Sequence, residues 1–197
     1  RYLLLLIILL VSNSFAWFIY SKQIESDLTA HVRAWNVQLS EGDTPITSYV
    51  NINVDSIYPG MANYQNDITV YNKGEIAADL TYEILDVNIL GVETKTKEGV
   101  LNEGGTLTGT EKTSAELTTE LANNYPFKTT ITITSTSIDA EEGQSTYSIK
   151  VTWPYESGDD ATDTTWGENA YTFKNDHPSS SSITMRIKLM ATQKAGS

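Results

Sequence analysis

Two patterns of hydrophobic and polar positions divide the chain. Residues 2–11 read YLLLLIILLV, and after a short polar break a second apolar stretch runs from Phe15 to Tyr20. From about residue 34 onward, short segments alternate between apolar and polar side chains instead. The first pattern is typical of a segment buried in lipid or against other apolar surface, and the second is typical of half-buried strands. We therefore expect two units, a hydrophobic N-terminal helix (residues 1–33) and a head domain (residues 34–197).

The alternating segments predict a mainly β head with an antiparallel β-sandwich or jelly-roll architecture. Period-two patterns rich in Val, Ile, Thr and Tyr indicate strands that bury one face. Turn-forming residues separate these segments, among them Asn72-Lys-Gly74 and Glu142-Gly143. Seven or eight such strands make a sandwich or jelly roll. The segments lie at residues 35–39, 49–55, 67–71, 80–90, 129–134, 147–153 and 183–189.

One short helix is expected within the head. Thr113-Ser-Ala-Glu116 has the sequence of a capping box, and Leu117 and Leu121 follow four residues apart. Asn123 and Asn124 then end the pattern. The helix is too short to be more than a crossover that covers one end of the sandwich.

The apolar segment is a signal peptide, a membrane anchor or an assembly device. The core of residues 2–11, followed by the small residues Ser14 and Ala16, fits a cleavable signal peptide. Because the chain begins at Arg1 rather than at a methionine, we expect processing ahead of Arg1 and retention of the segment. About 20 apolar residues span a bilayer, and Ile24, Leu28 and Val32 continue a helical spacing. A helical stem over residues 2–32 is therefore predicted.

This stem resembles that of type IV pilins in its position, its length and the β-rich head that follows. The sequence departs from the bacterial pattern at Arg1, and at Leu5, where bacterial pilins usually carry a glutamate. The resemblance implies that copies of the stem pack together as the core of a filament. The stem residues expected to make those contacts are Leu3, Leu4, Leu6, Ile7, Leu10, Val11, Phe15, Phe18 and Ile19.

The head resembles the camelysin and TasA-like surface fibre proteins. The resemblance lies in the step Ser14-Phe-Ala-Trp-Phe18, in Ile57-Tyr-Pro-Gly-Met61, in Tyr71-Asn-Lys-Gly74 and in a final strand that closes with Ala191-Thr-Gln193. It implies a jelly-roll head and extracellular fibres in which an N-terminal segment of one subunit completes the sheet of the next. The strand that would be donated contains Trp35, Val37 and Leu39.

The composition and motifs of the chain argue against several classes of function. The net charge of −12 argues against nucleic acid, whose binding needs clustered Lys and Arg. No cysteine is present, so disulfides are excluded. Neither His31 nor His177 lies in a metal-ligand motif or beside a nucleophile, and the sequence has no phosphate-binding loop. We therefore expect that the protein is not an enzyme and needs no cofactor.

One acidic cluster is a candidate for calcium, which takes 6–8 oxygen ligands. It contains Glu156, Asp159, Asp160 and Asp163, but its spacing does not match an EF-hand. The alternative interpretation is a solvated, turn-forming loop. The flanking Trp153 and Trp166 are expected to cover the end of the core, although exposed aromatic residues could instead bind glycan.

Together these patterns predict a structural subunit of an extracellular, pilus-like filament that serves adhesion or biofilm formation. Its partners would be other copies of itself, and it would lie in the cytoplasmic membrane before assembly. The alternative is a membrane-anchored, monomeric β-sandwich module that binds calcium or glycan on the cell surface.

Overall fold

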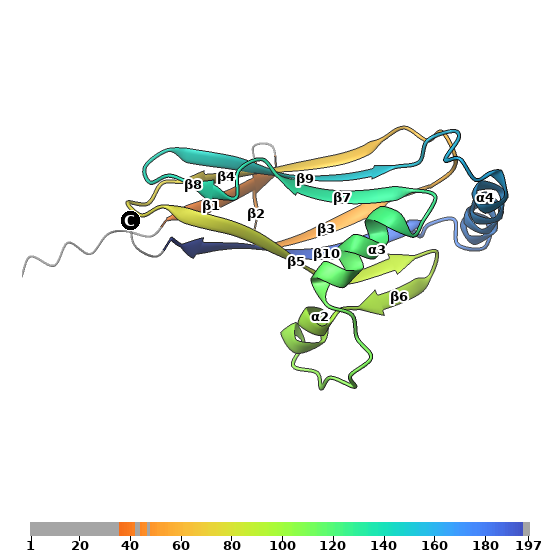
Figure 1. The fold of residues 1–197 in the computed structure, drawn as a ribbon, viewed down its shortest axis with the longest axis horizontal. Coiled ribbons are helices and arrows are strands. Elements are labelled where there is room, and N and C mark those ends of the chain that lie inside the picture. Colours follow the sequence, from red (N-terminus) through yellow and green to blue (C-terminus); the bar gives the residue numbers. More distant parts are fainter. Residues whose placement is uncertain (1–35, 42–43, 47, 195–197) are drawn as a thin grey trace, which may run out of the picture. The chain divides into compact units, whose positions relative to one another are not determined.

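A computed structural model describes residues 36–41, 44–46 and 48–194. The described residues belong to one compact unit. The described chain is built mainly of strands, with three helices between them (Figure 1). The elements are β1 Val37–Glu41, β2 Thr44–Ile46, β3 Tyr49–Val54, β4 Tyr64–Asn72, β5 Ala78–Ile89, β6 Val92–Lys95, α2 Lys97–Asn102, α3 Ser114–Asn123, β7 Lys128–Ile133, β8 Ser137–Ile138, β9 Gly143–Thr152, α4 Asp160–Asp176 and β10 Ile183–Gln193.

The strands form two antiparallel sheets that lie face to face (Figure 1). The first has the order β2-β1-β4-β9-β7, and the second has the order β3-β10-β5-β6, with β8 paired to β5. A mainly β, antiparallel head is thus confirmed. All seven alternating segments of the sequence contribute strands, with boundaries that differ by a few residues.

Alternation along the strands creates the core between the sheets. On β3 the residues Val50, Ile52 and Val54 are buried while the residues between them are exposed. Tyr147 is fully buried on β9, and the single hydrogen of its hydroxyl is shared between the carbonyl oxygens of Thr81 (2.9 Å) and Met190 (3.0 Å) on the opposite sheet. Burial also raises the pKa of the Tyr147 hydroxyl, so it stays protonated and keeps this link between the sheets.

The predicted capping box is confirmed at the start of α3. The Thr113 hydroxyl accepts a hydrogen bond from the Glu116 backbone N–H (3.2 Å), and the Glu116 carboxylate accepts one from the Thr113 N–H (2.7 Å). Leu117 and Leu121 are buried against the core, as their spacing predicts. The helix packs beside β7 and β5 and so covers part of one side of the two sheets (Figure 1).

Two further helices were not predicted. Residues 160–176 form α4, so the expectation of a turn-forming loop holds only for the residues before Asp160. The Thr- and Asp-rich composition of α4 hides its helical pattern, in which Trp166, Ala170 and Phe173 recur three or four residues apart on one face. The short α2 follows β6 and is capped by Thr96.

The two ends of the head differ. At one end the N–H of Lys73 bonds to the Asn36 carbonyl, and the N–H of Lys194 bonds to that of Ala77. The described chain therefore begins and ends at the same end of the sheets, while α4 lies across the other end (Figure 1). None of the helices in the described ranges combines the length and the hydrophobicity that a membrane crossing needs.

Candidate functional site

The predicted stem cannot be compared with the structure. Its nine contact residues, from Leu3 to Ile19, lie outside the described residues, and so do His31 and Trp35. The expected long apolar helix therefore remains a prediction from sequence.

The strand predicted for donation is described from residue 37 onward. Here β1 pairs with β4 of its own chain, from Val37 opposite Asn72 to Glu41 opposite Ile68. Val37 and Leu39 are half-buried and pack against the core. Among the described residues, only the three-residue β2 lies beyond β1, at the edge of the sheet. Within this described part of the chain, the hairpin of β1 and β2 thus joins the rest of its sheet through the ladder to β4 alone.

The acidic cluster serves the start of α4. Asp159 caps the helix, because its carboxylate accepts hydrogen bonds from the N–H (3.0 Å) and the hydroxyl (2.8 Å) of Thr162. Asp163 is 7 % exposed, and its carboxylate accepts the indole N–H of Trp153 (2.8 Å) and both the N–H and the hydroxyl of Ser157. The bond from Trp153 is the main reason that the pKa of Asp163 is lowered, and the bonds from Ser157 act in the same direction.

Two of the four predicted calcium ligands, Asp159 and Asp163, thus have structural partners within the protein. The residues predicted to bind calcium were Glu156, Asp159, Asp160 and Asp163. In the described part of the chain, no three His, Asp or Glu side chains converge closely enough to hold a metal ion. Asp159 and Asp163 instead orient the helix and the core tryptophan.

The two tryptophans cover the core end, as the first of the two interpretations predicts. Trp153 is 1 % exposed and packs against Phe127, with ring centroids 5.6 Å apart. It offers no surface to a sugar. Trp166 is half-buried and stands edge-on to Tyr125 (5.3 Å) and Phe127 (5.7 Å).

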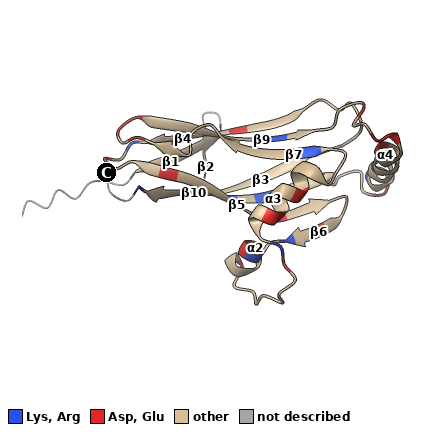
Figure 2. Cartoon of the chain, in the orientation of Figure 1, with Lys and Arg blue, Asp and Glu red and all other residues tan. Residues whose placement is uncertain are grey.

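Charged residues are unevenly distributed over the head. Figure 2 shows acidic residues on α3 and α4 and few charges along the strands. The cations on the strands of the second sheet form ion pairs, as in the bonds of Arg186 to Asp86 (2.7 Å) and Glu103 (2.5 Å). His177 ends α4, where its ring lies 5.0 Å from that of Phe173. Along the described ribbon in this view, Lys and Arg positions are scattered among acidic and uncharged ones.

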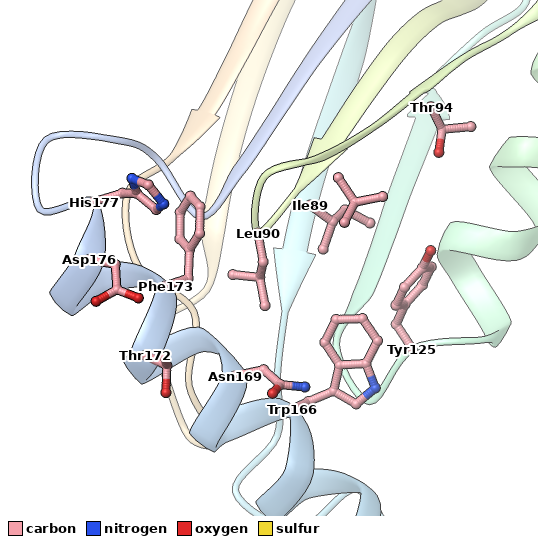
Figure 3. A pocket seen from close by; sticks show the side chains of 11 residues that line it. Ile89, Leu90, Thr94, Tyr125, Trp166, Asn169, Thr172, Phe173, Asp176 and His177 are labelled. Carbon is pink, nitrogen blue, oxygen red and sulfur yellow. The ribbon is translucent and has the colours of Figure 1, made fainter.

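A cavity that the sequence did not reveal lies between α4 and the turn joining β5 to β6 (Figure 3). Its volume is about 480 Å³. Three segments line it, namely α4, the end of β5 with the following turn and β6, and the connection from α3 to β7. The lining residues are Ile89, Leu90, Val92, Thr94, Tyr125, Trp166, Asn169, Thr172, Phe173, Asp176 and His177.

The turn that forms one wall has an unusual sequence. Leu90 has φ +49° and Gly91 has φ +86°, so both central residues are left-handed, as a type I′ hairpin requires. Asn-Gly is the preferred pair for this turn, and a left-handed leucine costs roughly 1–2 kcal/mol. Leu90 is nonetheless half-buried beside the cavity (Figure 3), so its apolar contacts offset the strain. An Asn-Gly pair would have predicted a hairpin turn at this position from the sequence, whereas Leu90-Gly91 does not.

No protein-family model, curated protein or solved structure matches this chain. Its function must therefore be inferred from its own residues and geometry.

Proposed function

We propose that this chain is a structural subunit of an extracellular cell-surface filament that serves adhesion or biofilm formation. The observation that carries the proposal is the placement of β1. This strand begins a few residues after the predicted stem of residues 2–32, and among the described residues its edge hairpin joins the sheet through the β4 ladder alone. A strand held in this way can pair with β4 of a neighbouring copy instead.

Such an exchange would preserve the native contacts. The five residue pairs between β1 and β4 can form within one chain or between two, with Val37 and Leu39 packed on the core in either case. Domain swapping of this kind is a low-cost route to assembly, because the contacts that form between two chains are the same as those within one chain. If every subunit both donates and accepts β1, the contact is head-to-tail and propagates into a fibre.

The N-terminal apolar segment would supply the second contact. An apolar helix outside lipid must bury its surface against other apolar surface, and a fully buried Leu or Ile contributes about 1.5–3 kcal/mol. In this proposal the stems of residues 2–32 pack together in the shaft after leaving the cytoplasmic membrane. The head would then be a jelly-roll sandwich of the camelysin and TasA-like kind.

Catalysis and nucleic-acid binding have no place in this proposal. Among the acidic side chains of the described head, Asp159 caps α4, Asp163 holds the indole of Trp153, and Asp86 forms an ion pair with Arg186. The net charge of −12 opposes binding to phosphate backbones.

The proposal predicts that filaments are lost when the apolar segment is made acidic. Replacing both Leu6 and Ile7 with Asp would place charges in the packed stems, where burying an unpaired carboxylate is too costly for assembly. Electron microscopy of sheared surface material should then show no filaments.

The matched control exchanges the same two residues as Leu6→Ile with Ile7→Leu, which keeps the hydrophobicity and should keep the filaments. Circular dichroism and thermal unfolding of both variants should show a folded head. Normal filaments from the double Asp variant would refute the role of the stem.

A further inference from the structure

We propose that the cavity between α4 and the β5–β6 turn binds a neutral pyranose unit of a surface polysaccharide. This inference is independent of filament assembly, since it depends on the opposite end of the head from β1. The cavity volume of about 480 Å³ falls within the range of about 300–1,000 Å³ that is typical of small-ligand sites.

The cavity combines an aromatic surface with polar groups at its rim. Trp166 and Tyr125 form one side, and Figure 3 shows the amide of Asn169 next to the Trp166 ring. A pyranose ring has an apolar C–H face that packs on an aromatic ring and hydroxyls at its edge that need hydrogen-bond partners. The arrangement of Trp166 and Asn169 offers both.

The polar groups at the rim are available to a ligand. Within the described residues, the side chains of Asn169, Thr172 and Asp176 make no hydrogen bond or ion pair. An amide, a hydroxyl and a carboxylate together provide donors and acceptors for sugar hydroxyls.

The charge at the cavity selects against anionic ligands. Asp176 is its one carboxylate, and no Lys or Arg is among the described residues that line it. The nearest cation on the same helix, Lys174, is held by Asp55 (2.6 Å) and by the carbonyl of Ser180 (2.9 Å). A neutral sugar therefore fits better than a uronic acid, a sialic acid or a phosphate.

The walls are fixed before any ligand binds. The Leu90 N–H donates to the Ser182 carbonyl (2.9 Å), and the Gly91 N–H donates to the Asn88 side chain (2.9 Å). Gly91 also touches the Phe173 ring so closely that a Cβ there would lie 3.2 Å from Cε2. The left-handed Leu90 is thus clamped beside the cavity, and strain of this kind is often retained where a site needs a fixed wall.

Exposed aromatic residues surround the same end of the head. Tyr171 on α4 is 71 % exposed, and Tyr155 just before α4 is 79 % exposed. Tyr58, in the loop that contacts Tyr155 through Gly60, is 54 % exposed. Tyrosine is enriched at binding interfaces, because its ring is apolar and its hydroxyl can hydrogen-bond. Because the described chain begins and ends at the opposite end, this surface is free to meet a polysaccharide.

Saturation-transfer difference NMR tests the proposal on the full chain in detergent. The probes are chitotriose, maltotriose and mannotriose, each titrated to about 10 mM, which covers millimolar affinities. At least one should bind, with Trp166→Ala raising the Kd about tenfold or more and Asn169→Ala raising it about fivefold. Thr165→Ala, at an exposed position of the same helix outside the cavity, should leave the Kd unchanged.

Asn169 is exposed, so its variant should fold even if Trp166→Ala is destabilised, and thermal unfolding checks both. Absence of a response to all three trisaccharides would overturn the proposal, as would equal affinity in the wild type and the Asn169→Ala variant. A loss of filaments in Trp166→Ala without any saccharide response would assign the cavity to protein contacts instead and would also overturn it.

Discussion

Replacing Asn72 with Asp is expected to lower the free energy of unfolding by about 3 kcal/mol at pH 7. Asn72 is fully buried at the end of β4. Its amide nitrogen donates to the carbonyls of Ile76 (2.7 Å) and Asp139 (2.9 Å), and its amide oxygen accepts the N–H of Gly74 (3.0 Å). Aspartate has nearly the same shape, but it loses both donors and places a carboxylate oxygen against two carbonyl oxygens.

The decrease in the free energy of unfolding caused by Asn72→Asp should depend on pH. Burial and the two carbonyls would raise the folded-state pKa of the new carboxyl above its unfolded value of about 3.9. The protonated form can donate one hydrogen bond, so the variant should be least destabilised near pH 4 and lose stability as the pH rises. Urea unfolding at pH 4 and pH 7 measures this difference.

Asn51→Asp is the matched control, because Asn51 is exposed on β3 and the same substitution there should change stability by less than about 0.5 kcal/mol. If Asn72→Asp unfolds with the same midpoint as the wild type at pH 7, the role assigned to this amide is wrong.

Replacing Gly99 with Ala should destabilise the head by about 3 kcal/mol, although alanine is the better helix former. Gly99 is buried in α2, and a Cβ there would lie 2.0 Å from the Leu85 carbonyl oxygen on β5. Backbone atoms of a central strand cannot move aside, so α2 must shift. The shift would strain the hydrogen bonds of Thr96, whose hydroxyl accepts the Gly99 N–H and donates to the Ile84 carbonyl.

Gly167→Ala is the control for helix propensity. Gly167 lies within α4, and a Cβ added there would have Cδ of Pro59 as its nearest neighbour, at an ordinary 3.7 Å. This variant should therefore gain about 0.5–1 kcal/mol. Thermal unfolding compares the two, and a Gly99→Ala variant as stable as the wild type would contradict the close contact between α2 and β5.

The strands were predictable because their side chains follow a local rule. Alternation of buried and exposed residues in Tyr49–Val54 is visible in the sequence and reappears in the structure. The capping box of Thr113 and Glu116 is equally local, since its two hydrogen bonds join residues three positions apart.

What the sequence did not reveal depends on distant partners. The side-chain amide of Asn72 can be buried because its donors are satisfied, and one of its acceptors is the carbonyl of Asp139, 67 positions away. Asp163 lies in α4, where its carboxylate accepts the indole N–H of Trp153 ten positions away, and in the sequence it was indistinguishable from a calcium ligand. The cavity likewise needs α4, the β5–β6 turn and Tyr125 together, and no single segment carries its pattern.

The most direct test of the filament proposal is to shear wild-type cells without detergent and to image the released high-molecular-weight material by electron microscopy, with N-terminal sequencing of its main protein. The account predicts filaments built from this chain, with the apolar segment of residues 2–20 still present in the subunit. Recovery of the chain only in detergent extracts, as dispersed monomers, would contradict it and would favour the membrane-anchored surface module.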